Sequence, residues 1–167
     1  MTSKIKEVFS NIKAEKRKAL ITYIVSGDPD TETTIEIMNS MVQQGTDIIE
    51  LGIPFSDPMA EGISIQKGHE RALEKGVSLK GTFELLKKFR ANDEKTPIVF
   101  MGYMNTFESL GAKQFMSEAV KANLDGILIV DMPPEESSDF STEAEKVGID
   151  IILSLIHISE PTRRLVI

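Results

Sequence analysis

The chain has 167 residues, no cysteine and a formal net charge of −7. The lack of cysteine excludes disulfides, Cys-ligated zinc and thiol nucleophiles, and the acidic balance argues against a nucleic-acid-binding protein, which would present a basic face. Hydrophobic residues make up 41% and charged residues 27% of the chain, which predicts one domain with a folded core rather than disorder.

The start of the chain and its apolar runs bear on the cellular compartment. The first residues open a charged amphipathic stretch that no signal-peptide apolar core follows. No apolar run approaches the ~20 residues that a membrane span needs. We therefore expect a cytoplasmic protein that contacts no membrane.

Helical and strand patterns alternate along the chain. Helices are expected where apolar residues recur at helical spacing, and strands where short β-branched apolar runs are bounded by turn residues. In chain order we expect a helix over 4–14, a strand over 19–25, a helix that Asp30 or Thr31 caps and Gly45 ends, a strand over 47–53, a helix over 64–74, a helix capped by Ser78, a strand over 97–101, a helix over 109–121, a strand over 125–130, a helix over 135–147 and a strand over 149–153.

The expected strands are apolar on nearly every residue. Such strands are buried on both faces, which predicts an α/β fold with a parallel sheet covered by helices. An open doubly wound sheet and a barrel both fit this pattern. No Gly-x-Gly-x-x-Gly follows the first strand, which argues against a dinucleotide-binding fold. In either architecture the chemistry is expected at the carboxyl ends of the strands.

Glu50 is an ionisable residue inside an expected strand. Side chains alternate along a strand, so Ile48 and Glu50 share one face while Ile49 and Leu51 share the other. Burial of a carboxyl is costly unless it is paired or protonated, and burial raises its pKa toward the range of efficient acid–base catalysis. This favours a catalytic role, and the alternative is a structural Glu bonded to a neighbouring backbone group or Lys.

The other polar candidates are weaker when each is taken alone. Carboxylates in a loop such as 54–62 are usually solvated, Tyr23 favours packing over lining a pocket, and Tyr103 and Asn105 fit a ligand contact or a helix cap equally well. Asp28 and Asp131 favour turns or caps, and His69 is expected to face solvent. The basic residues of one helix are expected to form a solvated face; they are Lys80, Lys87, Lys88 and Arg90.

The segment Glu50 to Gly62, ELGIPFSDPMAEG, resembles the signature of the tryptophan synthase alpha subunit family around its catalytic carboxylates. The turn 27–29 (GDP), the segment 103–105 (YMN) and the segment 131–137 (DMPPEES) support the resemblance, which covers residues 5–153. It implies a (β/α)8 TIM-barrel fold, here an incomplete barrel with about five parallel strands.

The family resemblance also implies a reaction and a set of site residues. The reaction is the retro-aldol cleavage of indole-3-glycerol phosphate to indole and glyceraldehyde 3-phosphate, with Glu50 as the acid–base residue and Glu61 as the carboxylate that binds the indole N–H. The positions that would line the indole pocket are Tyr23, Met101, Tyr103 and Val130. The positions that would contact a beta subunit in an alpha2-beta2 complex are Pro54, Asp57 and Asn105. Pyridoxal phosphate belongs to that beta partner, so neither a cofactor nor a metal is expected in this chain.

Two residues depart from the family pattern. The family usually has Asp at the position of Glu61 and Pro at that of Ile63. The extra methylene moves the carboxylate by roughly 1.5 Å, and misplacements near 1 Å can cost about 100-fold in rate. Loss of the Pro loosens the loop, so reduced activity is expected.

The length of the chain and its last residues also depart from the family. A (β/α)8 barrel needs about 250 residues and binds phosphate through the loops after strands seven and eight, so we expect the chain as written to be inactive and its open sheet edges to favour aggregation. Residues 153–163 resemble the translation of a sequencing adapter. We expect a partial barrel over 1–153 and a non-native tail over 154–167, the alternative being a divergent C-terminus.

Two other functions remain open at this point. One is a non-catalytic half-barrel that docks a partner through loop 54–62. The other is a different sugar-phosphate barrel enzyme, such as an isomerase or decarboxylase. Those enzymes commonly use a Lys on a strand, and the interiors of the expected strands carry none.

Overall fold

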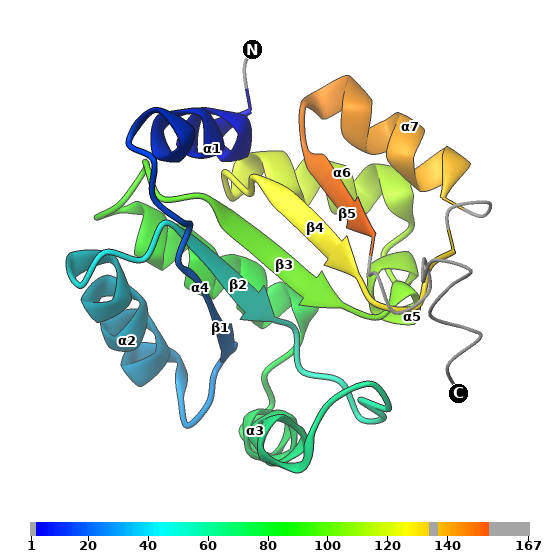
Figure 1. The fold of residues 1–167 in the computed structure, drawn as a ribbon. Helices are drawn as coiled ribbons and strands as arrows, with labels where there is room; N and C mark the ends of the chain where they lie inside the picture. Colours follow the sequence, from blue (N-terminus) through cyan, green and yellow to red (C-terminus); the bar gives the residue numbers. More distant parts are fainter. Residues whose placement is uncertain (1–2, 134–136, 154–167) are drawn as a thin grey trace, which may run out of the picture.

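A computed structural model describes residues 3–133 and 137–153, and these contain one parallel sheet with the strand order β1-β2-β3-β4-β5 (Figure 1). The strands are β1 (Ile21–Val25), β2 (Ile48–Gly52), β3 (Ile98–Gly102), β4 (Gly126–Ile129) and β5 (Asp150–Leu153). A doubly wound sheet reverses its strand order at a switch point, whereas this order runs in sequence throughout. The sheet is therefore the wall of a barrel-type fold.

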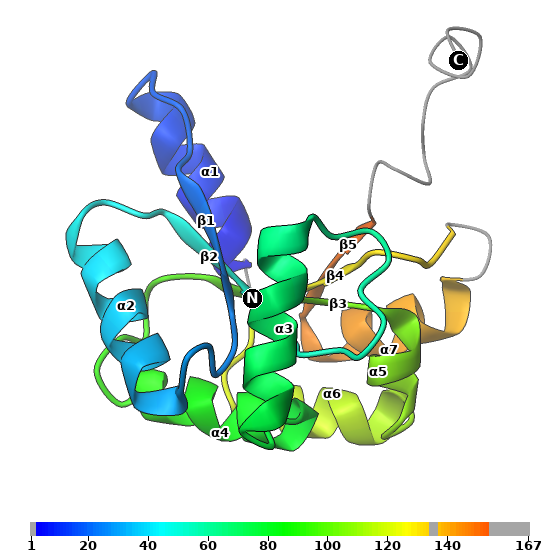
Figure 2. The same ribbon diagram turned by 90° about the horizontal axis from the view of Figure 1, so that it is seen from below.

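Most of the helices that connect the strands lie on one face of the sheet, whereas α3 (Ile63–Glu74) lies at the carboxyl ends of β1 and β2 (Figure 1). The connecting helices and the first helix are α1 (Lys4–Ala14), α2 (Thr31–Gln43), α3 (Ile63–Glu74), α4 (Leu79–Arg90), α5 (Met104–Glu108), α6 (Ala112–Lys121) and α7 (Ser138–Val147). Right-handed crossovers between strands paired in sequence bring their helices to the same side. Figure 2 shows α2, α4, α6 and α7 along that side and α1 on the opposite side. None of the helices within the described ranges is long and apolar enough to cross a membrane.

The two faces of the sheet differ in what covers them. Ile49 and Leu51 are fully buried in the large core between the sheet and the helices. On the other face, here called the inner face, Ile5 of α1 packs against Ile48 and Val99. The predicted alternation along β2 is confirmed, and it puts Glu50 on the inner face, two residues beyond the contact with α1.

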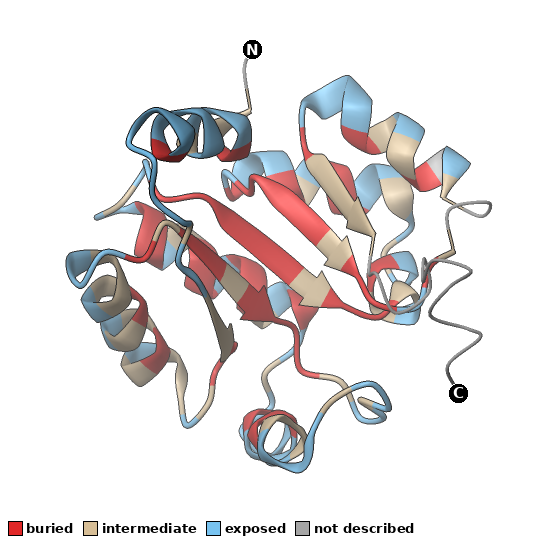
Figure 3. Cartoon of the chain, viewed as in Figure 1, coloured by how far each residue is buried: buried red, intermediate tan, exposed pale blue. Residues whose placement is uncertain are grey.

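Burial is concentrated in the central strands. Figure 3 shows β2, β3 and β4 largely buried, whereas β1 and β5 are mostly of intermediate exposure. Ile21 of β1 is 43% exposed. Each outer strand has one hydrogen-bonded neighbour among the described residues, so its other edge offers unpaired backbone groups.

The predicted elements agree with the structure to within about two residues at their ends, except that the helix expected over 135–147 begins at Ser138 and that the region around residue 109 differs. The structure has a short helix, α5, that the sequence did not indicate, and α6 begins at Ala112 instead of 109. Asp131 Oδ1 accepts a hydrogen bond of 2.7 Å from the Met104 N–H at the start of α5. Gly111 has φ +74°, a left-handed conformation that separates the two helices.

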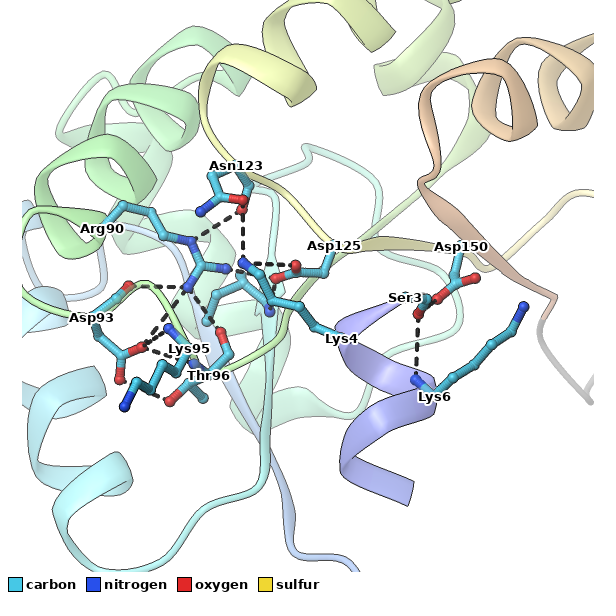
Figure 4. A network of polar contacts seen from close by, with 11 residues as sticks. Ser3, Lys4, Lys6, Arg90, Asp93, Lys95, Thr96, Asn123, Asp125 and Asp150 are labelled. Carbon is cyan, nitrogen blue, oxygen red and sulfur yellow. Dashed lines mark hydrogen bonds and ion pairs between the residues drawn. The ribbon is translucent and has the colours of Figure 1, made fainter. Parts of the chain in front are cut away.

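The expected solvated face of α4 is wrong for Arg90, whose side chain is buried (Figure 4). Its guanidinium donates to Asp125 Oδ2 at 2.6 Å. It also donates to three backbone carbonyl oxygens at 2.8–3.1 Å, those of Asn123, Asp93 and Thr96. A solvated Arg would make none of these bonds, so Arg90 is a structural residue at the amino end of the sheet.

Asp125 joins this network to two further elements. Its Oδ2 accepts from the Ile98 N–H at 2.9 Å, and its Oδ1 lies 3.1 Å from Lys4 Nζ of α1. The cluster therefore ties α4, α1 and the starts of β3 and β4 together. It lies at the end of the sheet opposite to the carboxyl ends of the strands, where barrel residues serve stability rather than catalysis.

Candidate active site

Glu50 lies in the middle of β2, in register with Tyr23 of β1 and Val99 of β3. Its side chain is partly buried on the inner face, and burial raises the pKa of its carboxyl above the ordinary value of 4.5. Among the described residues no hydrogen bond or ion pair involves this carboxyl. The structural alternative, a Glu bonded to a neighbouring backbone group or Lys, is therefore not observed there.

Tyr23 crosses the inner face beside Glu50. A Cβ at Gly52 would overlap the Tyr23 hydroxyl, so the phenol runs directly over that glycine. Burial raises the pKa of the Tyr23 hydroxyl, and the negative charges of Glu61 and Glu50 raise it further. Tyr23 is therefore a neutral aromatic side chain that forms part of the wall around Glu50.

Gly52→Ala is expected to destabilise the chain by about 1–3 kcal/mol, because the added methyl must displace the Tyr23 ring. Chemical denaturation of the 167-residue chain measures this. Gly81→Ala in α4 is the matched control, since a Cβ there meets no atom closer than 3.8 Å and alanine favours a helix over glycine. Equal stability of Gly52→Ala and the parent chain would contradict the described path of the Tyr23 side chain.

Glu61 belongs to the loop that follows β2 and lies near Glu50. Burial raises the pKa of the Glu61 carboxyl, and the negative charge of Glu50 adds to the effect. A carboxylate at Glu50 therefore disfavours ionisation of Glu61. The inner face thus carries a pair of carboxyls at the carboxyl end of the sheet.

The backbone on both sides of Glu61 is anchored. The Ala60 N–H donates to the Tyr103 hydroxyl at 2.9 Å, and Gln66 Nε2 donates to the Glu61 carbonyl oxygen at 2.9 Å. Tyr103 is 2% exposed and its ring stacks on Phe55 with centroids 5.0 Å apart. Tyr103 therefore anchors the loop through the hydrogen bond from the Ala60 N–H, a contact that the sequence did not indicate.

The expectation that His69 faces solvent is wrong. The side chain is buried, with 3% exposed. Its Nδ1 accepts from the Phe55 N–H at 3.1 Å and its Nε2 lies 3.4 Å from the Tyr23 hydroxyl. The sequence did contain a signal for this burial, because Ile65, Gly68 and Ala72 occupy the same face of α3 at helical spacing.

The remaining positions of the expected indole pocket lie near the same end of the sheet. Met101 of β3 is in register with Gly52 and, by alternation from Val99, lies on the inner face. Val130 directly follows β4 and is 3% exposed. Tyr23, Met101 and Val130 thus offer one aromatic and two apolar side chains at the end of the sheet where Glu50 lies.

The three positions expected at a partner interface also follow strands at this end. Pro54 is buried at the start of the loop after β2, whereas Asp57 of that loop and Asn105 of α5 are exposed. A groove of about 410 Å³ lies between the loop and the helices beside it. Its lining includes Pro54, Leu79, Thr106 and Leu110.

A family model described as the tryptophan synthase alpha chain matches residues 9–166. The chain belongs to the tryptophan synthase alpha chain family. The alpha chain of Burkholderia mallei (strain NCTC 10229) is 48% identical over 161 residues, which are 96% of this chain and 59% of the relative. That of Polynucleobacter asymbioticus is 48% identical over 96% of this chain and 61% of the relative. This member of the tryptophan synthase alpha chain family thus spans about three fifths of the length of these relatives.

Solved structures of tryptophan synthase alpha chains confirm the incomplete TIM-barrel fold. An alpha chain from Legionella pneumophila has a TM-score of 0.87 at 39% identity, with 91% of this chain and 57% of that chain covered. A structure of the tryptophan synthase a2b2 complex from Pyrococcus furiosus has a TM-score of 0.76 at 40% identity, with 81% of this chain and 57% of that chain covered. The domain boundary at 153, the tail over 154–167 and residues 134–136 of the DMPPEES segment lie at or outside the limits of the described residues, so the division of the chain stays a prediction.

Proposed function

We propose that this tryptophan synthase alpha family chain carries the catalytic carboxyls of an indole-3-glycerol-phosphate lyase, which cleaves its substrate to indole and glyceraldehyde 3-phosphate. The observation that supports it most is the Glu50 carboxyl on the inner face, which no described residue binds by a hydrogen bond or ion pair and whose pKa is raised by burial. Glu61 beside it supplies a second carboxyl, whose pKa is raised by burial and further by the negative charge of Glu50. A raised pKa lies closer to the working pH, so that both the protonated and the ionised form of the carboxyl are available.

The proposed cleavage needs one proton delivered and one removed. Protonation of indole C3 puts a positive charge on the ring, and the bond between C3 and the glycerol carbon then breaks with its electron pair returning to the ring. The hydroxyl on the glycerol carbon loses its proton and becomes the aldehyde. Glu50 in its protonated form gives the first proton, and as a carboxylate it accepts the second, so it ends the cycle unchanged.

Glu61 has the second role in the proposal. Its carboxylate accepts a hydrogen bond from the indole N–H, and this stabilises the positive charge that develops on the ring when C3 is protonated. Tyr23, Met101 and Val130 contact the flat apolar faces of the indole. These side chains exclude water from the carboxyls and so keep the pKa of Glu50 raised.

The substrate phosphate needs a separate site. In TIM barrels that site is typically built from the loops after strands seven and eight, and the described residues contain five strands. We therefore propose that turnover requires further barrel strands. Activity is best measured in a chimera, in which residues 1–153 are followed by the corresponding carboxyl-terminal residues of the Burkholderia mallei relative.

We also propose a protein partner. Pro54 lines the groove at the carboxyl end of the sheet, and Asp57 and Asn105 are exposed residues next in sequence to the lining residues Ser56 and Thr106. The Pyrococcus furiosus relative was solved in a tryptophan synthase a2b2 complex. The proposed partner is a tryptophan synthase beta subunit, which carries pyridoxal phosphate and receives the indole. This chain itself needs no cofactor for the cleavage.

In the chimera, Glu61→Gln is expected to lower kcat for indole release by about 100-fold, because the amide keeps a hydrogen-bond acceptor but loses the charge. Glu61→Asp keeps the charge and is expected to retain turnover. Glu74→Gln, an exposed position of α3, is the control and should match the parent chimera. An unchanged rate in Glu61→Gln would remove Glu61 from the mechanism and favour a docking role for its loop.

A further inference from the structure

His69 of α3 connects two separate walls of the site. On one side its Nδ1 accepts from the Phe55 N–H at 3.1 Å, at the start of the loop that carries Glu61. On the other side its Nε2 lies 3.4 Å from the hydroxyl of Tyr23, which crosses the inner face beside Glu50. One imidazole therefore contacts both elements that border the two carboxyls.

The two contacts define the protonation state of the ring. A nitrogen that accepts from an N–H carries no proton, so Nδ1 is unprotonated. The neutral ring then has its proton on Nε2, which donates to the oxygen of the Tyr23 hydroxyl. In a doubly protonated ring, Nδ1–H would face the Phe55 N–H, donor against donor, and the hydrogen bond that holds the loop would be lost.

We propose that His69, as the neutral Nε2–H tautomer, is a positioning residue that holds Tyr23 and the start of loop 54–62 in one fixed arrangement around Glu50 and Glu61. The proposal rests on the lyase function proposed above. His69 does not touch the substrate. It acts through the Tyr23 hydroxyl and the Phe55 amide.

The surroundings of His69 favour the neutral ring. Burial lowers its pKa below the ordinary value of 6.5, and Asp28, the ionised group that affects it, acts in the opposite direction. Asp28 is bound by the guanidinium of Arg71 at 2.7 and 2.8 Å, which reduces its pull on a proton at His69. The Tyr23 hydroxyl, which lies 3.4 Å from Nε2, is a titratable group whose own pKa is raised by burial.

Close packing of α3 against the end of β1 fixes where the imidazole lies. A Cβ at Gly68 would meet Asp28 Oδ2 at 3.0 Å and Val25 Cγ2 at 3.2 Å, so the helix approaches the strand at the residue next to His69. The far end of the loop is held independently, by the Ala60 N–H bond to Tyr103. Loss of His69 is therefore expected to free the start of the loop and leave its end in place.

Three substitutions separate the two contacts. In His69→Asn the short amide oxygen can replace Nδ1 as the acceptor for Phe55. In His69→Gln the longer amide nitrogen can replace Nε2 as the donor to Tyr23. His69→Leu keeps the apolar bulk and removes both contacts. The Asn and Gln variants keep the test valid if the Leu variant unfolds.

The first measurement uses the 167-residue chain and does not depend on catalysis. Nitrogen-15 spectra of the ring should show the Nε2–H tautomer at pH 7, and the exchange of the Phe55 amide hydrogen should rise by about 10-fold or more in His69→Gln and His69→Leu. His69→Asn should keep the Phe55 amide protected, and the Ala60 amide should exchange as in the parent. A protonated Nδ1, or unchanged Phe55 exchange in both the Gln and Leu variants, would overturn the proposal.

The second measurement uses kinetics of the chimera. His69→Leu should lower kcat by about 100-fold, the cost of a misplacement near 1 Å, with a smaller change in KM. The loss of kcat/KM toward acid pH should begin at lower pH in His69→Asn and His69→Gln, which cannot take up a proton there. A merely structural role would leave the pH profile of these two variants unchanged, and that result would also overturn the proposal.

Glu50→Gln in the same chimera separates this proposal from the proposed function. Full turnover in Glu50→Gln would refute the lyase mechanism, and the positioning role built on it would fall too, whatever the exchange data show. Loss of turnover in Glu50→Gln together with parental kcat in His69→Leu would refute the positioning role alone. Loss of turnover in both, with the shifted pH profile, supports both proposals.

Discussion

Glu50→Gln is expected to lower kcat for indole release by the chimera by about 1,000-fold, within the range that one general acid–base residue contributes. Gln matches Glu in shape but can neither deliver the proton to indole C3 nor accept the one from the glycerol hydroxyl. Substrate contacts with the surrounding walls remain, so KM should change little. A kcat within tenfold of the parent chimera would mean that Glu50 is not the acid–base residue.

The same substitution should make the 167-residue chain more stable at neutral pH. The folded chain holds the Glu50 carboxyl at a pKa above its ordinary value of 4.5, because burial disfavours the charged form. The stability of the parent is then full below about pH 4.5 and falls as the pH rises through the raised pKa. Glu50→Gln lacks this loss, so its advantage in the free energy of unfolding should grow from pH 4 to pH 7.

The largest loss of stability is expected from Arg90→Leu, about 3–5 kcal/mol. Removal of the guanidinium takes away the closest ion-pair partner of the buried Asp125 and leaves it with Lys4 and the Ile98 N–H, and breaking a buried ion pair from one side has a cost of this size. Three backbone carbonyl oxygens lose a donor as well. Urea denaturation of the 167-residue chain measures the change.

Two further variants serve as comparisons for the stability of Arg90→Leu. Asp125→Asn keeps an oxygen that can accept from the Ile98 N–H and removes the charge, so it should cost less than Arg90→Leu. Lys88→Ala, at an exposed position of the same helix, should change stability by no more than about 0.5 kcal/mol. A cost below about 1 kcal/mol for Arg90→Leu would show that the network at the amino end of the sheet does not stabilise the fold.

Much of the fold could be predicted because its signals are local. Asp30 and Ser78 cap α2 and α4 through their side chains as expected, and Gly45 follows α2 with φ +95°. The strand runs needed only a few consecutive apolar residues to be recognised. The alternation along β2 was sufficient to put Glu50 on the face opposite to Ile49 and Leu51.

The features that sequence reasoning missed depend on residues far apart in the chain. Periodicity does not determine strand order, so the choice between an open sheet and a barrel wall needed the structure. Arg90 was misplaced because its partner Asp125 is 35 residues away. His69 was misplaced because its contacts, Tyr23 and Phe55, come from β1 and the loop after β2.

The site was predicted in part. The structure brings Glu50, Glu61, Tyr23 and Met101 to one end of the sheet, although their roles stay predictions. The resemblance indicated Tyr103 as a pocket residue, and the structure adds a hydrogen bond from the Ala60 N–H to its hydroxyl. Motif residues could suggest which positions meet the substrate, but the contacts that hold the loop become visible only when α3 and β3 are placed around it.

A carbon-13 titration of the Glu50 side-chain carboxyl in the 167-residue chain, assigned by comparison with Glu50→Gln, measures whether burial raises the pKa of this carboxyl as its acid–base role requires. We expect a midpoint above the ordinary 4.5, which remains raised in Glu61→Gln because burial is its cause. A midpoint at or below 4.5 would mean that this carboxyl is solvated, and the proposed acid–base role would be contradicted.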